Sequence, residues 1–401
     1  MQQQAGEGET LGVEEELHLL DPDTLALTSR AGALLALLDG PGVVGELPLS
    51  QIEVVTPVCR SLADVRAELG RLRGTAADAA VAAGLRLASC GTAPLAEWRV
   101  NRASGDAQYD AVRATAGHLV REQLIAGQHV HVGVGDPERA VAVVDRCRDW
   151  LPVLLALSAS SPYWLGADSG FSSWRAVHWR RWPVGGPPPV SGSVAAYDAE
   201  VDALLTAGLV ERPTQVYWDL RRSVRFPTVE FRVADAAQTL DEAVAMTGLC
   251  RALARAALAE HDAGEPLRRT PDRQLSTACW LAAKAGLTGS LLDPRPGGGG
   301  PVAARAAVES LLSHVTPWLG EDRGEVERLV AAVLDGGGGA ERQRAAAAAG
   351  GGPRAAAELV VAETVLGTTR TGRPRVGTAP GSRGLDAREQ ALAAERPPHH
   401  G

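Results

Sequence analysis

Lysine is almost absent from this sequence. The 401 residues include 40 arginines and lysines, and only one of these is a lysine, Lys284, which stands between alanines and a glycine. A P-loop needs a lysine directly after glycine, a protein kinase needs a strand lysine, and pyridoxal enzymes need a lysine that forms a Schiff base. The surroundings of Lys284 fit none of these classes. If the chain binds a nucleotide, arginines and metal ions must therefore hold its phosphates.

Cysteine pairs, long apolar runs and excess positive charge are also missing. No run of ~20 apolar residues is free of charges, as a membrane helix would require, and residues 1–10 are polar and acidic, unlike a signal peptide. The net charge of −8 provides no basic field for nucleic acid or an anionic membrane. The cysteines are scattered and odd in number, so we expect reduced thiols in a cytoplasmic protein. We also expect small-molecule partners. The cysteines are Cys59, Cys90, Cys147, Cys250 and Cys279.

The spacing of apolar residues predicts helices, and a cluster of prolines and glycines predicts a loop. Apolar residues at helical intervals predict helices over Leu62–Leu87, Ala140–Leu157 and Leu240–Ala259. The proline- and glycine-rich segment Trp182–Pro189 is predicted to be a loop.

Low-complexity sequence begins after about residue 295. Three glycine- or alanine-rich stretches are predicted to be linkers around a helix or two: Gly297–Gly300, Gly336–Gly339 and Ala345–Gly352. Residues 367–401 lack apolar periodicity and are rich in Arg, Gly and Pro, which predicts a disordered tail after a single domain over residues 1–366.

One predicted strand, Leu11–Leu20, carries an unusual set of side chains. Residues two apart in a strand share a face. Glu14, Glu16 and His18 therefore share one face, opposite an apolar face on which Glu15 is the odd member.

Three more predicted strands repeat this arrangement. Beside an apolar face, Gln51–Thr56 presents Glu53, Gln128–Val134 presents His129 and His131, and Thr228–Val233 presents Glu230 and Arg232. For any single strand, the simpler interpretation is an antiparallel sheet with one solvated face. The four together favour bound cations, because clustered carboxylates repel one another unless a cation offsets their charge.

The ligand types indicate which cation this would be. A zinc site would need clustered Cys and His, and the H-E-x-x-H signature is absent. Carboxylates with one or two imidazoles suit Mg²⁺ or Mn²⁺, hard ions that bridge to phosphate oxygens. Metal ions and arginines without a P-loop imply phosphoryl transfer from ATP on a sheet surface.

Six segments, in this order, resemble the carboxylate–amine ligase family, also called glutamate–cysteine ligase type 2. The resemblance runs from about residue 10 to 366. The segments are Leu11–Leu17, Gln51–Pro57, Gly127–Val134, Ser158–Pro189, Tyr217–Arg221 and Thr228–Arg232.

The resemblance implies an α+β fold like that of glutamine synthetase, in which a curved antiparallel sheet forms an active-site funnel with helices packed outside. It also implies a homodimer. Arg232 falls at a phosphate-binding position, with a substrate or phosphate role extended to Arg175 and Arg221, and Glu53 and Arg232 are expected to act in catalysis. The implied metal ligands are Glu14, Glu16, Glu53, His129 and Glu230.

The reaction implied by the resemblance has two steps. ATP phosphorylates the γ-carboxylate of glutamate, and the amine of cysteine then displaces phosphate to give a γ-glutamyl amide and ADP. Three alternatives stay open: another amine acceptor, an ATP-dependent amine or guanidine phosphotransferase, and a catalytically weak nucleotide-binding protein. Ala93 departs from the family, whose members often carry histidine there, and puts efficiency or the choice of amine in question.

Overall fold

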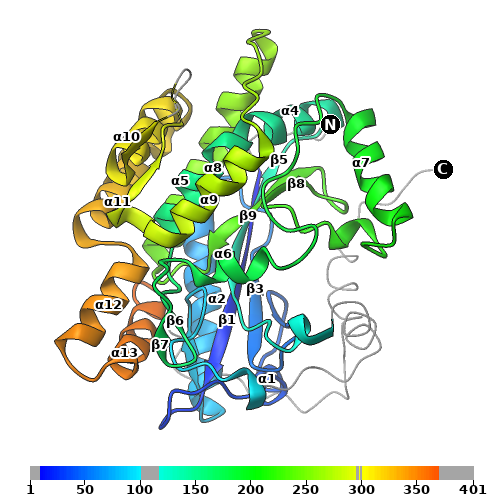
Figure 1. Ribbon diagram of the computed structural model, residues 1–401. Helices are drawn as coiled ribbons and strands as arrows, with labels where there is room; N and C mark the ends of the chain where they lie inside the picture. The colour runs from blue at the N-terminus through cyan, green and yellow to red at the C-terminus, as the bar shows by residue number, and fades with distance from the viewer. Residues whose placement is uncertain (1–9, 101–116, 295–297, 299, 370–401) are drawn as a thin grey trace.

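The computed structural model describes residues 10–100, 117–294, 298 and 300–369. Its centre is an antiparallel sheet with the strand order β2-β3-β1-β5-β9-β8, in which β4 also pairs with β1 (Figure 1). The four strands predicted to carry acids and imidazoles are β3, β1, β5 and β9, which are adjacent in the middle of the sheet. The bounds are β1 Leu11–Leu20, β2 Val43–Gly45, β3 Gln51–Val55, β4 Arg86–Ala88, β5 Gly127–Gly133, β8 Leu220–Arg222 and β9 Thr228–Asp235.

The strand register brings the polar side chains opposite one another. Glu14 of β1 is paired with His129 of β5, and Glu16 of β1 is paired with Glu53 of β3. On the other side of β5, His131 is paired with Glu230 of β9. Since paired residues of antiparallel strands share a face, residues distant in sequence meet on one surface of the sheet.

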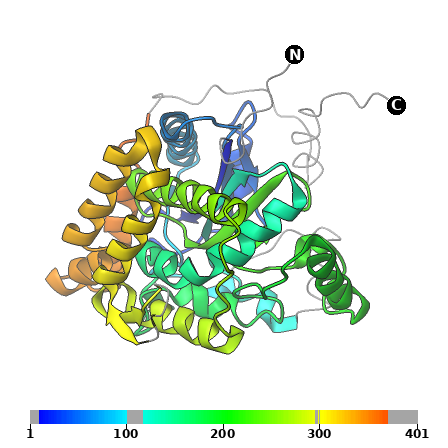
Figure 2. The same cartoon turned by 90° about the horizontal axis from the view of Figure 1, so that it is seen from above.

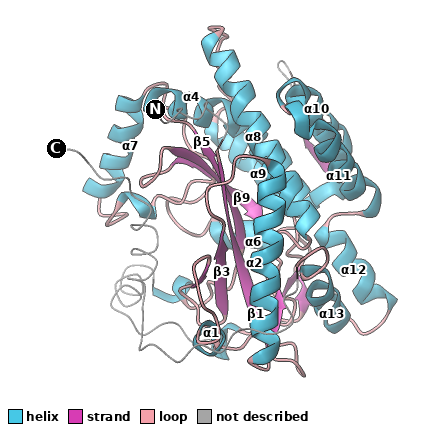
Figure 3. Cartoon of the chain, turned by 180° about the vertical axis from the view of Figure 1, so that it is seen from behind, coloured by secondary structure: helices cyan, strands magenta, loops and turns pink. Residues whose placement is uncertain are grey.

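The opposite face of the sheet is apolar and packs against helices α2 (Leu62–Ala82) and α8 (Leu240–Asp262), which cross in front of the strands in Figure 3. Leu17, Val130 and Phe231 on this face belong to one buried cluster that also includes residues of both helices. The expected α+β class with a large antiparallel sheet is confirmed.

Two predicted helices differ from those observed. The first ends at Ala82 rather than Leu87, because Gly84 has φ +69° and turns the chain into β4. The second is divided into α4 (Pro137–Cys147) and α5 (Leu151–Ser158) by a short 3₁₀ turn. Pro152 has no N–H with which to continue an α-helix through this point.

The C-terminal part is more helical than the sequence predicted. Four helices, α10 to α13, gather on one side of the sheet (yellow to orange in Figure 2), opposite α7. The linker predicted at Ala345–Gly352 was wrong as far as Ala349, which ends α12, because a run of alanines is a strong helix former. The bounds are α9 Asp272–Ala285, α10 Ala304–Val315, α11 Arg323–Gly336, α12 Gly339–Ala349 and α13 Pro353–Thr364.

The remaining elements are short. They are α1 Ala31–Leu35, α6 Trp174–Trp179, α7 Val194–Thr206 and the hairpins β6–β7 (Tyr163–Trp164, Ala167–Asp168) and β10–β11 (Ser290–Leu292, Pro301–Ala303). Of the predicted tail, residues 370–401 lie outside the described residues, whereas Thr369 donates its backbone N–H to Gly70 O of α2 at 3.0 Å. No helix in the described ranges is both long and apolar enough to cross a membrane.

Candidate active site

The polar face of the sheet forms the floor of a cavity of about 300 Å³. Its walls come from the loop before β3, the region around α6 and the hairpin that joins β8 to β9. The strand residues that line it are Glu14, Glu16, Gln51, Glu53, His129, His131, Arg221, Glu230 and Arg232. Every metal, phosphate and catalytic residue predicted from the sequence, Arg175 included, therefore lines one cavity.

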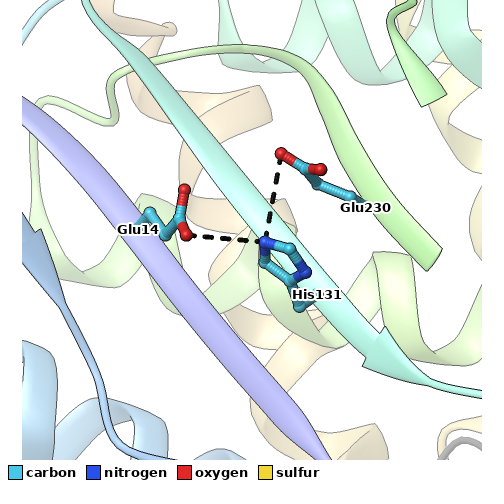
Figure 4. Close-up of side chains that lie close together, drawn as sticks. All are labelled: Glu14, His131 and Glu230. Carbon is cyan, nitrogen blue, oxygen red and sulfur yellow. Dashed lines mark ion pairs between the residues drawn. The ribbon is translucent and has the colours of Figure 1, made fainter. Parts of the chain in front are cut away.

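Two groups of metal-ligand type meet at Glu14. Glu14, His131 and Glu230 form one group, shown in Figure 4, and Glu14, Glu53 and His129 form the other, with potential ligand atoms within 4.8 Å of one another in each. His129 Nδ1 lies 3.1 Å from one Glu14 oxygen, and His131 Nε2 lies 3.6 Å from the other. His131 Nε2 is also 3.9 Å from Glu230 Oε1. Glu14 is thus the shared member.

Two residues of β1 lie outside these groups. Glu16 lines the cavity and accepts a hydrogen bond from Gly127 N at 2.7 Å. Burial, aided by the negative charge of Glu46, raises its pKa to about 7. His18, predicted to share this face, is fully buried, with its Nδ1 3.2 Å from Gln51 Nε2, and burial lowers its pKa to about 4. His18 is not among the described lining residues of the cavity.

His131 was not among the metal ligands inferred from the family, although the alternation in its strand placed it beside His129. Thr228 Oγ1 lies 2.9 Å from its Nδ1, which leaves Nε2 directed at the two carboxylates. The alternating pattern alone could have identified it.

The charges of the site strongly affect one another. Burial alone would raise the pKa of Glu14, but hydrogen bonds with His129 and His131 outweigh burial and hold that pKa well below its usual range. Burial opposes ionisation of Glu230 as well, and there the positive charges of Arg232 and Arg221 lower the pKa. Both carboxylates are therefore anionic at neutral pH.

Three arginines surround the carboxylates. Arg232 contacts Glu230 through Nη1, and Arg221 donates to Glu230 through Nε at 2.8 Å. Arg175 and Arg232 both lie with Cζ 5.8 Å from the centre of the Trp179 ring. The Nε–H groups of Arg175 and Arg232 are buried and have no acceptor within the described part of the chain. Buried donors of this kind suit the oxygens of an anionic ligand.

Ala93 lies away from the cavity. It is fully buried in a separate apolar cluster with Cys90 and Leu124, and it is not one of the described residues that line the site. Ala93 therefore contributes no side chain to the cavity wall of this protein.

Comparison with known proteins identifies the family of this chain. The sequence profile of the glutamate–cysteine ligase family 2 matches residues 10–356. The chain belongs to that family. It is 42% identical over 322 residues to "Putative glutamate–cysteine ligase 2-1" of Saccharopolyspora erythraea, covering 80% of this chain and 85% of that protein. It is also 42% identical over 329 residues to "Putative glutamate–cysteine ligase 2" of Salinispora arenicola, covering 81% and 86%.

This member of the glutamate–cysteine ligase family 2 also resembles solved structures. The glutamate–cysteine ligase of Francisella tularensis, solved with AMP, has a TM-score of 0.68 at 12% identity, covering 97% of this chain and 95% of that one. A bifunctional glutathione synthetase from Pasteurella multocida has a TM-score of 0.61 at 14% identity, covering 89% of this chain and 52% of that one. These similarities show the fold, which is the glutamine synthetase-like α+β fold that the family resemblance implied. By family, the protein is an ATP-dependent carboxylate–amine ligase.

Proposed function

We propose that this ligase joins the γ-carboxylate of L-glutamate to the amino group of L-cysteine. ATP would first phosphorylate the glutamate γ-carboxylate, and the cysteine amine would then displace phosphate, giving γ-glutamylcysteine, ADP and phosphate. The names of its relatives support this substrate pair. The observation that carries the proposal is the cavity floor, where carboxylates and imidazoles from separate strands meet buried arginines with unused N–H donors.

The donor set fits hard divalent cations. Carboxylates dominate it, and imidazoles complete it, as in sites for Mg²⁺ or Mn²⁺. Such ions would neutralise phosphate oxygens during the transfer. The residues that would hold them are Glu14, Glu16, Glu53, His129 and Glu230, and the geometry adds His131.

The arginines divide into two roles. The N–H groups of Arg221 are bonded to Glu230 and to the carbonyls of Thr214 and Val216, so Arg221 holds Glu230 in place. Arg175 and Arg232 keep an unused Nε–H. These two arginines would bind the phosphates of ATP or the acyl phosphate. Arg232, which also contacts Glu230, would stabilise charge during phosphoryl transfer.

The experiment measures phosphate release from ATP and Mg²⁺ with glutamate and a panel of amines that includes cysteine. Glu53→Gln is expected to lower kcat at least 100-fold, as loss of an electrostatic group at the reacting phosphate does. Glu358→Gln, on the exposed surface of α13, is the matched control and should leave the rate unchanged.

The outcomes separate the alternatives. Release that requires both glutamate and cysteine supports the proposal. Release with glutamate and a different amine keeps the ligase chemistry and changes the acceptor. A phosphorylated amine in place of an amide would identify a phosphotransferase, and binding of ATP without any release would identify a binding protein. The homodimer and the cytoplasmic location are further proposals, and sedimentation of the purified chain would test the first.

A further inference from the structure

Asp235 is a buried carboxylate at the end of β9. It is fully buried and is not among the described residues that line the cavity. It accepts three hydrogen bonds, from Ser160 N at 2.9 Å, Ser161 Oγ at 2.6 Å and Ser173 Oγ at 2.8 Å. Three donors around one buried carboxylate stabilise its charged form and fix its orientation.

The direction of the serine hydrogen bonds is set by the start of α6. Ser161 Oγ accepts the backbone N–H of Arg175 at 3.1 Å, and Ser173 Oγ, the N-cap of α6, accepts that of Ala176 at 3.2 Å. A hydroxyl that accepts a backbone N–H uses its own hydrogen for the remaining partner. Both serines therefore donate to Asp235, and they connect its carboxylate to the first turn of the helix that carries Arg175.

The Arg175 side chain is held from several sides. Its Nη1 lies 3.9 Å from Asp235 Oδ1 and donates to Val233 O at 3.3 Å, and its Nη2 donates to Arg232 O at 3.2 Å. A Cβ added to Gly127 would lie 2.4 Å from Nη2, so a larger residue there would displace the guanidinium. The side chain lines the cavity, and no described residue accepts its Nε–H.

We infer that Asp235 is a positioning residue, which fixes Arg175 through Ser161 and Ser173 so that the arginine can bind an anionic oxygen of a substrate. That oxygen belongs to an ATP phosphate or to the glutamate carboxylate, and the inference rests on the proposed function. Gly91 supports the role of this carboxylate. A Cβ at Gly91 would lie 2.6 Å from Asp235 Cγ and 2.9 Å from Ser161 Cβ, so the close approach of this segment depends on glycine.

A double-mutant cycle in the full-length protein tests the inference. Asp235→Asn puts an amide N–H opposite one of the groups that donate to Asp235, which should displace Arg175. A misplacement of about 1 Å costs about 100-fold in rate, so kcat/KM should fall by about 100-fold. In an Arg175→Ala background, the same substitution should lower kcat/KM by less than about 3-fold, because the residue through which Asp235 acts is gone. Equal losses in both backgrounds would overturn the inference, since they would mean that Asp235 acts on the fold alone.

Asp149→Asn is the matched control. Asp149 is another buried carboxylate, bonded to Thr270 Oγ1 at 2.9 Å and paired with Arg268 at 3.1 Å, and it is not one of the described residues that line the cavity. We expect it to lower thermal stability without the 100-fold kinetic loss. If Asp235→Asn does not fold, Ser173→Ala removes one of the connecting bonds, and the cycle is repeated with that variant.

Separate KM values for ATP and for glutamate identify which substrate oxygen Arg175 binds. A KM for ATP that rises in both Asp235→Asn and Arg175→Ala assigns Arg175 to a phosphate, and a KM for glutamate that rises in both assigns it to the carboxylate. If the wild type releases no phosphate with any amine, the proposed function fails. The double-mutant cycle is then measured through the Kd values of ATP with Mg²⁺ and of glutamate. Additive effects of the two substitutions on both Kd values would overturn the positioning role.

Discussion

The buried pair Glu15–Arg73 yields a quantitative prediction for stability. Glu15 is the odd acid on the apolar face of β1, and Arg73 of α2 reaches it with two bonds of 2.7 Å, from Nε and Nη2. Both side chains are completely buried. Arg73 Nη2 also donates to Ala237 O at 2.7 Å, so the guanidinium is satisfied only while this geometry persists.

Glu15→Gln removes the charge and leaves Arg73 as a buried cation with a weaker partner. Breaking a buried pair in this way costs about 3–5 kcal/mol. The entropy of unfolding of a 401-residue chain is about 0.8 kcal/mol/K, so this loss lowers Tm by about 4–6 °C.

Thermal unfolding followed by circular dichroism measures this shift. Glu68→Gln is the matched control, because Glu68 pairs with Arg71 on the same helix at the surface. An exposed pair contributes about 0–1 kcal/mol, so the control should shift Tm by about 1 °C or less. Equal shifts for the two variants would refute the reasoning that the Glu15–Arg73 pair holds β1 against α2.

Three further predictions test other parts of the structure. Glu14→Gln should weaken Mn²⁺ binding, followed by electron paramagnetic resonance, more than His129→Gln does, because Glu14 belongs to both ligand groups; equal weakening would contradict this. Gly248→Ala should destabilise the protein by about 1–3 kcal/mol, since its new Cβ would lie 2.5 Å from Val326 Cγ2. Gly324→Ala has open space around it and should stabilise the protein by about 0.4–1 kcal/mol. Urea unfolding measures both changes. Burial lowers the pKa of His178 to about 4, so its contribution to stability is complete above its usual pKa of about 6.5 and is lost as pH falls toward 4. His178→Gln should therefore lose less stability than the wild type over that pH range, and parallel pH profiles would exclude the effect.

The sequence predicted which residues share the cavity better than it predicted the surroundings that hold them. Alternation along four strands was sufficient to predict that Glu14, Glu53, His129 and Glu230 share a surface, because the period of a strand is fixed. It could not predict that His18 would turn out to be buried beside Gln51, since a neighbouring strand decides how far along a face the cavity extends.

Partners distant in sequence were not predictable from periodicity. Glu15 and Arg73 are 58 residues apart, and Asp235 meets Ser161 across 74 residues. Nothing in the local pattern of either carboxylate indicates its partner. The helix ending at Ala349 was missed for another reason, because alanine-rich, glycine-flanked sequence has the composition of a linker as well as that of a helix.

The strand order also constrains how the protein comes into being on the ribosome. β1 is made first, yet its neighbour β5 and the next strand, β9, follow more than 100 and 200 residues later. Glu14 therefore leaves the ribosome long before Glu230 exists, and the complete cavity can form only after most of the chain has been synthesised. A nascent or truncated chain that ends before β9 would carry the first acids of the site without Glu230 and Arg232. Metal binding or turnover by this protein would therefore report that the chain has been made and folded at least through β9.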